Sequence, residues 1–165
     1  MGTRFDVLSL RGLGMLTKHK LWSDAFQRVV ALGVVHPNAQ QRFLNAWCRV
    51  GSSLRQIIDD DPTLCDALRV LLPCYRGPPV SLYRGESARR QHIGLSWTRS
   101  YHLAEKFALY GIESVRSPRR GGGVVLHTIA EEVAIISAPC LLGGFEGEYI
   151  VDPRRLTDVT IIHRF

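Results

Sequence analysis

This sequence of 165 residues lacks long apolar runs. No stretch approaches the roughly 18 apolar residues that a membrane-spanning helix needs, so we predict a protein that does not cross a membrane. The opening residues, MGTRFDVLSLRG, contain neither an apolar signal core nor a small-residue cleavage site. We therefore expect a cytoplasmic protein, or one delivered into a host cytoplasm without a cleavable signal.

Metal-ligand spacing is missing as well. The four cysteines are scattered without a C-x-x-C pair, and the six histidines show no H-x-x-x-H spacing. Scattered cysteines are typical of structural thiols in a reducing compartment. We therefore expect no disulfide framework, no zinc site and no other bound metal.

Composition leaves the class of ligand open. The chain is 45% hydrophobic and 22% charged, which is ordinary for a globular protein, and its length suits one domain with a sizeable core. Its formal net charge of +6 favours phosphate-bearing ligands. A dinucleotide, a nucleic acid and an acidic protein surface all fit that charge.

The first part of the chain, residues 1–78, is predicted to be helical. Apolar residues recur at spacings of three and four from Phe43 to Ile57, although Gly51 interrupts the pattern and could break the helix. A second helix is expected in DDPTLCDALRVLLP, with Asp61 as its N-cap, Pro62 at its first position and a stop at Pro73.

From residue 79 onward the pattern changes to short β-rich runs separated by glycine and proline. The expected strands include SLYRGES, VVLHTIA, VAIISA, EYIVD and LTDVTIIHRF. One helix is expected among them in SYHLAEKFALYG, capped by Ser100 and ended by Gly111. This order predicts an α+β fold, with residues 1–165 as one domain in which a helical part, 1–78, precedes a core, 79–165.

Two glutamates stand close together in FEGEYIVDP. Alternate residues of a strand point to the same side, so Glu146 and Glu148 would share one surface. Two carboxylates that close repel each other unless a cation, a proton or a ligand lies between them. This spacing therefore makes the pair a candidate site.

Three short motifs now stand in order: LYRGE with Arg84, GLSWTRS with Ser96 and Thr98, and FEGEYIVD with its two glutamates. Together they resemble the Arg, Ser-Thr-Ser, Glu-x-Glu signature of the ADP-ribosyltransferase superfamily, over residues 79–165. Trp97 replaces the central threonine of that signature. The resemblance implies a split antiparallel β-sandwich around an NAD cleft.

The resemblance also implies the roles of the two glutamates. Breaking the bond between ribose and nicotinamide passes through an oxocarbenium-like transition state, which a nearby carboxylate stabilises. Glu148 matches the second glutamate of the family motif and would hold the ribose 2′-hydroxyl. Glu146 matches the first and would orient or deprotonate the acceptor, which is usually an arginine side chain in families that carry both.

The remaining motif residues would hold NAD. Arg84 matches the arginine that contacts the NAD phosphates, and a guanidinium fork suits a pyrophosphate. Ser96 and Thr98 match positions that steady the catalytic glutamate, while we expect Trp97 to pack in the sheet. The residues assigned to NAD binding are Arg84, Gly85, Ser96, Trp97, Thr98 and Tyr110.

Several functions remain compatible with these motifs. The first is a mono-ADP-ribosyltransferase that modifies a protein, as a small bacterial or phage effector; an NAD glycohydrolase, with water as the acceptor, is a variant of it. An acceptor other than protein, such as nucleic acid, is also open. A non-enzymatic module that binds phosphates or nucleic acid through its basic residues ranks second, and an inactive transferase fold third.

Overall fold

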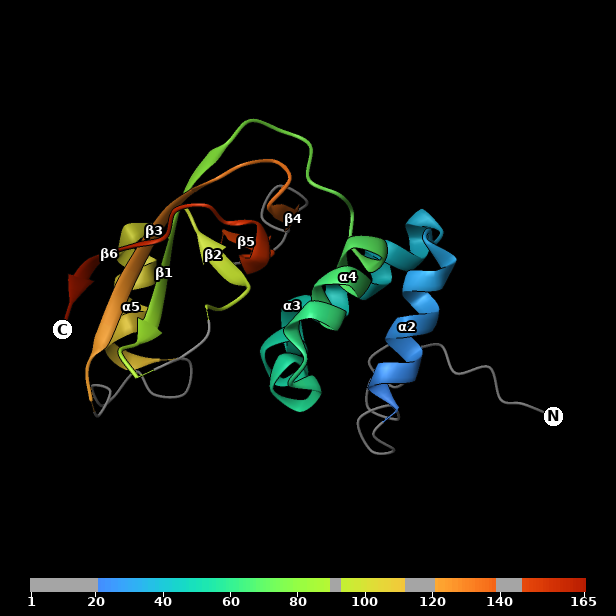
Figure 1. Cartoon of the computed structure of the whole chain (residues 1–165), viewed down its shortest axis with the longest axis horizontal. Helices are drawn as coiled ribbons and strands as arrows, with labels where there is room; N and C mark the ends of the chain where they lie inside the picture. Colours follow the sequence, from blue (N-terminus) through green and yellow to red (C-terminus); the bar gives the residue numbers. More distant parts are fainter. Residues whose placement is uncertain (1–20, 90–92, 112–120, 139–146) are drawn as a thin grey trace. The chain divides into compact units, whose positions relative to one another are not determined.

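A computed structural model of the chain describes residues 21–89, 93–111, 121–138 and 147–165 (Figure 1). The chain divides into two compact units, Met1–Cys74 and Tyr75–Phe165. The first is helical and the second holds every described strand, so the chain has the predicted α+β character. The sequence analysis treated 1–165 as one domain with a change of pattern after residue 78, and the boundary between the units lies close to that change.

The first unit contains three described helices, α2 (Trp22–Leu32), α3 (Pro37–Ile58) and α4 (Asp61–Leu71), and α4 packs against both others. Their apolar stripes form its core. The largest buried side chains on α2 and α3 are Trp22, Phe26, Phe43, Leu44, Trp47 and Leu54. On and after α4 they are Leu64, Leu68, Leu71 and Leu72.

Two details of this unit differ from the sequence analysis. Helix α3 continues through Gly51, which packs against the Trp47 indole; a Cβ there would come within 2.7 Å of the ring. The N-cap of α4 is Asp60, not Asp61: the Asp60 carboxylate accepts a hydrogen bond from the Thr63 backbone N–H at 3.1 Å. Asp61 is already helical, and its carboxylate pairs with Arg55.

The second unit is built on one antiparallel sheet of six strands, in the order β4-β5-β2-β1-β3-β6. The strands are β1 (Val80–Ser87), β2 (Ser96–Thr98), β3 (Gly123–Ala130), β4 (Ile135–Ser137), β5 (Glu148–Val151) and β6 (Thr160–Arg164). A short 3₁₀ turn, η2 (Pro153–Arg155), follows β5. Helix α5 (Tyr101–Tyr110) has the predicted cap, Ser100, and the predicted stop, Gly111.

The sheet is nearly divided between β1 and β2. Strands β1 and β3 pair along their whole length, from Val80 opposite Ala130 to Ser87 opposite Gly123. In contrast, β1 and β2 are joined by a single described register pair, Tyr83 opposite Thr98. The resemblance implied a sandwich of two sheets, but the described strands form one sheet, in which β4-β5-β2 and β1-β3-β6 are joined at a single register pair.

The two faces of the sheet are buried differently. One face carries the larger core cluster, which includes Leu82, Trp97, Tyr149 and Val151. The other lies under α5, which runs along β1 and β3 in Figure 1. Gly85 lets that helix approach, because a Cβ there would collide with the α5 backbone. The glycine of LYRGE thus has a packing role in this fold.

Candidate functional site

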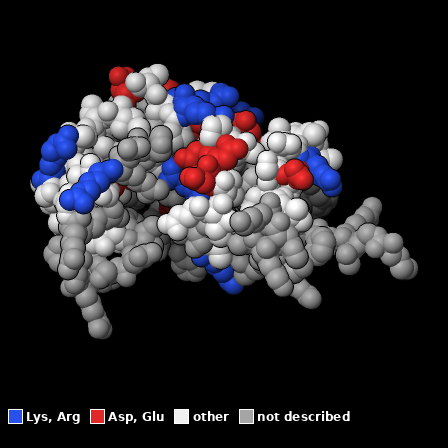
Figure 2. Space-filling view, turned by 60° about the horizontal axis from the view of Figure 1, so that its bottom comes forward, with Lys and Arg blue, Asp and Glu red and all other residues white. Residues whose placement is uncertain are grey.

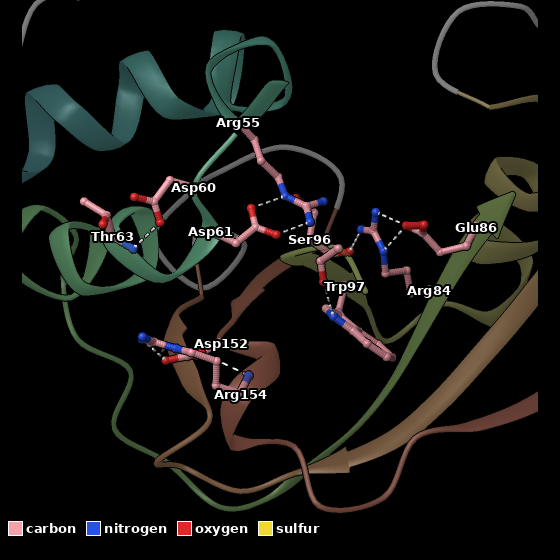
Figure 3. Close-up of polar contacts among 11 residues, drawn as sticks. Arg55, Asp60, Asp61, Thr63, Arg84, Glu86, Ser96, Trp97, Asp152 and Arg154 are labelled. Atoms are coloured by element: carbon pink, nitrogen blue, oxygen red, sulfur yellow. Dashed lines mark hydrogen bonds and ion pairs between the residues drawn. The ribbon is translucent and has the colours of Figure 1, made fainter. Parts of the chain in front are cut away.

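Arg84 lies on β1 beside the place where the sheet divides. Its guanidinium makes contacts on two sides, drawn in Figure 3. Nε donates a hydrogen bond to Glu86 Oε1 at 2.5 Å, and Nη2 forms an ion pair with the same oxygen. Nη1 donates to the main-chain carbonyl of Ser96 on β2. Each of the three guanidinium nitrogens therefore has a contact that fixes the orientation of the group.

Glu86 is a residue of this site that the sequence analysis missed. Its side chain is only 4% exposed, and that of its partner Arg84 only 13%. The signal was present in LYRGES, because residues two apart in a strand share a face.

Gly94 packs directly against the arginine. A Cβ at this position would overlap the guanidinium of Arg84. The Gly94 carbonyl also accepts a hydrogen bond from Trp97 Nε1 at 3.0 Å. The segment before β2 is thus fitted to both side chains, and the glycine leaves the space that the guanidinium fills.

The three residues of β2 have three different environments. Ser96 is exposed, Trp97 is 2% exposed within the larger core cluster, and Thr98 is 7% exposed. The hydroxyl of Thr98 accepts a hydrogen bond from the Ser100 backbone N–H at 3.1 Å, at the start of α5. The position of Trp97 is that of a packing residue, as expected, and its indole is closed to a ligand by the surrounding core.

Glu148 is the first residue of β5, and it lies directly opposite Thr98 in the ladder. Residues opposite each other in an antiparallel pair point to the same side. Ser96, two residues from Thr98, shares that side. The half-buried Glu148 is therefore held beside the Ser-x-Thr motif. Glu146 lies outside the described residues.

The structure connects the three motifs through β2. Arg84 bonds to Ser96, and the ladder holds Thr98 against Glu148. By register, however, Arg84 lies on the side of β1 that carries Leu82, whereas Glu148 lies on the side of Thr98 and Tyr83. By register, Arg84 and Glu148 therefore lie on opposite faces of the sheet.

Tyr110 is the last residue of α5 and is half-buried. It is carried by the helix that packs over β1, not by one of the three strands that bear the motifs. The residues that follow, 112–120, which include most of the basic glycine-rich loop, lie outside the described part of the chain.

Among the residues that the structure describes, no three or more His, Cys, Asp or Glu side chains gather as a metal site would require. No described helix is long and apolar enough to cross a membrane. On the face in Figure 2, the coloured basic and acidic side chains form separate small groups. That face presents no continuous basic track among its described residues.

Comparisons of the chain with protein-family models, with curated proteins and with solved structures found no match. The motif residues and their arrangement in the sheet therefore provide the evidence for function.

Proposed function

We propose that residues 79–165 form a mono-ADP-ribosyltransferase, which transfers ADP-ribose from NAD to a protein arginine side chain and releases nicotinamide. The observation that carries this proposal is the position of β2. The strands that bear the arginine, Ser-x-Thr and glutamate motifs are successive neighbours, β1-β2-β5, although long segments separate β2 from β5 in the chain.

The near-division of the sheet supports the same proposal. A split antiparallel sandwich with NAD at the split needs a place where two halves of the β-structure separate. The single Tyr83–Thr98 pair is such a place, and both Arg84 and the Ser-x-Thr motif adjoin it. We therefore place NAD around this division, with its pyrophosphate toward Arg84 and its nicotinamide ribose toward Glu148.

The proposed reaction follows from the chemistry of the two glutamates. The bond from the ribose anomeric carbon to the nicotinamide nitrogen breaks, and its electron pair leaves with neutral nicotinamide. The Glu148 carboxylate stabilises the oxocarbenium-like carbon that results. A guanidinium nitrogen of the acceptor then bonds to that carbon and loses a proton, which Glu146 accepts.

The location proposed for this activity is a cytoplasm, either of the producing cell or of a host. The four cysteines are scattered along the sequence without a C-x-x-C pair, which is typical of structural thiols in a reducing compartment. A small bacterial or phage effector would act in such a compartment.

A test needs only the purified chain and NAD labelled in its adenylate phosphate. The protein is incubated with a bacterial lysate and, separately, with free arginine as a small guanidinium acceptor. A labelled protein band or labelled arginine is the expected result. Free ADP-ribose alone would make the protein an NAD glycohydrolase. Intact NAD, together with no NAD binding by calorimetry, would overturn the proposal and favour a phosphate-binding module.

A further inference from the structure

We infer that Glu86 is a positioning residue that fixes the guanidinium of Arg84 for the pyrophosphate of NAD; this inference rests on the proposed function. Glu86 itself would not touch the ligand. Its role would be to orient the side chain that does.

The contacts fix the plane of the guanidinium. Both residues project from the same side of one strand, two positions apart, and Figure 3 shows their side chains turned toward each other. Glu86 takes the edge formed by Nε and Nη2, while the Ser96 carbonyl takes Nη1. An anchor on either side of the planar group prevents rotation about the last side-chain bonds.

Burial makes this anchor stronger than a surface ion pair. Exposed pairs contribute little because water competes for both partners. Here the Glu86 side chain is 4% exposed, so water has little access to the pair. A charge-assisted hydrogen bond in such a place is short and directional.

An anchored arginine is a better phosphate ligand than a mobile one. A long side chain that becomes ordered only on binding loses rotamer entropy at that step, whereas one that is already ordered does not. The opposite effect also exists, because the Glu86 charge repels phosphate. We expect orientation to dominate, since Glu86 holds the Nε–Nη2 edge of the guanidinium and the Ser96 carbonyl holds Nη1, so the group is already ordered before a ligand binds.

Glu86→Gln tests the inference, because it keeps the size and an acceptor oxygen but removes the charge. We expect NAD to bind about tenfold more weakly, with a raised KM and a kcat at saturating NAD within about twofold of the parent. If Glu86 served only stability, Glu86→Gln would lower the melting temperature but would bind NAD as tightly as the parent at temperatures where it is folded. Unchanged or tighter NAD binding would overturn the inference.

Two further variants sharpen this test. Glu132→Gln is the matched control, because it removes an exposed carboxylate of the same unit that pairs with Arg76 at 3.1 Å; NAD affinity should not change. In an Arg84→Lys background, Glu86→Gln should alter NAD affinity by less than about twofold, since Glu86 acts through Arg84. Full additivity of the two substitutions would contradict a role through Arg84.

A measurement on the parent protein covers the case in which Glu86→Gln fails to fold. In ¹⁵N spectra the Arg84 Nε–H, identified by its loss in Arg84→Lys, should exchange slowly before NAD is added. A rapidly exchanging signal would overturn the inference. If the parent protein does not bind NAD, the proposed function fails and the inference with it. If the parent binds NAD and Glu86→Gln binds it equally well, only the inference fails.

Discussion

The two units of this chain bury different kinds of side chain. Among the described residues, the buried side chains of the helical unit are almost all apolar, with Trp22, Phe43 and Leu68 as examples. The described polar and charged residues that are buried all belong to the second unit: Glu86, Thr98, Thr128, Ser137 and Asp152. Removing such groups from water opposes folding unless partners compensate them.

This difference means that folding makes different demands on the two units. A helical unit with an apolar core needs little more than its stripes and its caps. A unit that buries carboxylates must place partners beside them, and it does so at Glu86 with Arg84 and at Asp152 with Arg154. Of these two pairs, only the first borders the division of the sheet. We therefore expect changes to the Arg84–Glu86 pair to alter NAD affinity, and changes to the Asp152–Arg154 pair to alter only the free energy of unfolding.

The largest expected effect is at Glu148. Glu148→Gln keeps the shape of the side chain but removes the charge that would stabilise the oxocarbenium ion. We expect NAD hydrolysis and ADP-ribose transfer both to fall by about a hundredfold or more, with the melting temperature little changed. Nicotinamide release measures the effect, and Glu131→Gln, at an exposed position, is the control. Full activity in Glu148→Gln would refute the function.

Glu146→Gln distinguishes the proposed role of Glu146 from that of Glu148. We expect transfer to an arginine acceptor to fall by about a hundredfold, because a protonated guanidinium needs a base, while most NAD hydrolysis remains. Labelling of the acceptor and nicotinamide release are measured on the same samples. Equal losses of the two activities would show that the glutamates do not divide the work as we propose.

Arg84→Lys keeps the positive charge but loses the planar guanidinium with its paired N–H donors. We expect NAD affinity to fall about tenfold and the free energy of unfolding to fall by about 1–3 kcal/mol, since contacts with Glu86 and Ser96 are lost together. Calorimetry and thermal melts measure the two effects. Arg76→Lys, on an 82% exposed side chain, should change neither. Loss of stability without loss of affinity would make Arg84 purely structural.

Asp152→Asn tests the other buried carboxylate. The fully buried Asp152 side chain accepts hydrogen bonds from Arg154 at its backbone N–H, 3.1 Å away, and at Nη2, 2.8 Å away. We expect the free energy of unfolding to fall by about 1–3 kcal/mol while KM and kcat stay within about twofold of the parent. A large loss of activity in a folded variant would break the division between the two buried pairs.

The smallest effect is expected in the helical unit. Asp60→Ala removes the N-cap of α4 and should lower the free energy of unfolding by about 1 kcal/mol. Asp60→Asn should cost much less, because asparagine also caps a helix, and neither change should alter NAD affinity. Chemical denaturation gives both values. Equal stability of Asp60→Ala and the parent would disprove the cap.

What the sequence predicted depended on how local each signal was. Helix α5 was predicted with both its ends because Ser100 and Gly111 carry their own signals. Before Pro62 the predicted cap, Asp61, is one residue late, since Asp59, Asp60 and Asp61 offer the same chemistry and the backbone conformation decides among them. The predicted strand LTDVTIIHRF is shorter in the structure, beginning at Thr160.

The candidate site was less predictable because it depends on strand order. The motifs named Arg84, Ser96 and Glu148, but no local pattern states that β2 lies between β1 and β5. The burial of Trp97 followed from its type and its place in a strand. The hydrogen bond from Arg84 to the Ser96 carbonyl could not be predicted, because it depends on how β1 and β2 meet, and that is a tertiary feature.

The single residue pair between β1 and β2 has a consequence for motion. Local opening costs least where few backbone hydrogen bonds must break together, so the two halves of the sheet should open as separate cooperative units in native-state hydrogen exchange. A ligand that touches Arg84 on one half and Glu148 on the other would make them open together. Protection of the β3 backbone amides from hydrogen exchange would then rise, although β3 is not adjacent to the strand that bears Glu148. Slower exchange in β3 would thus indicate that a ligand is bound.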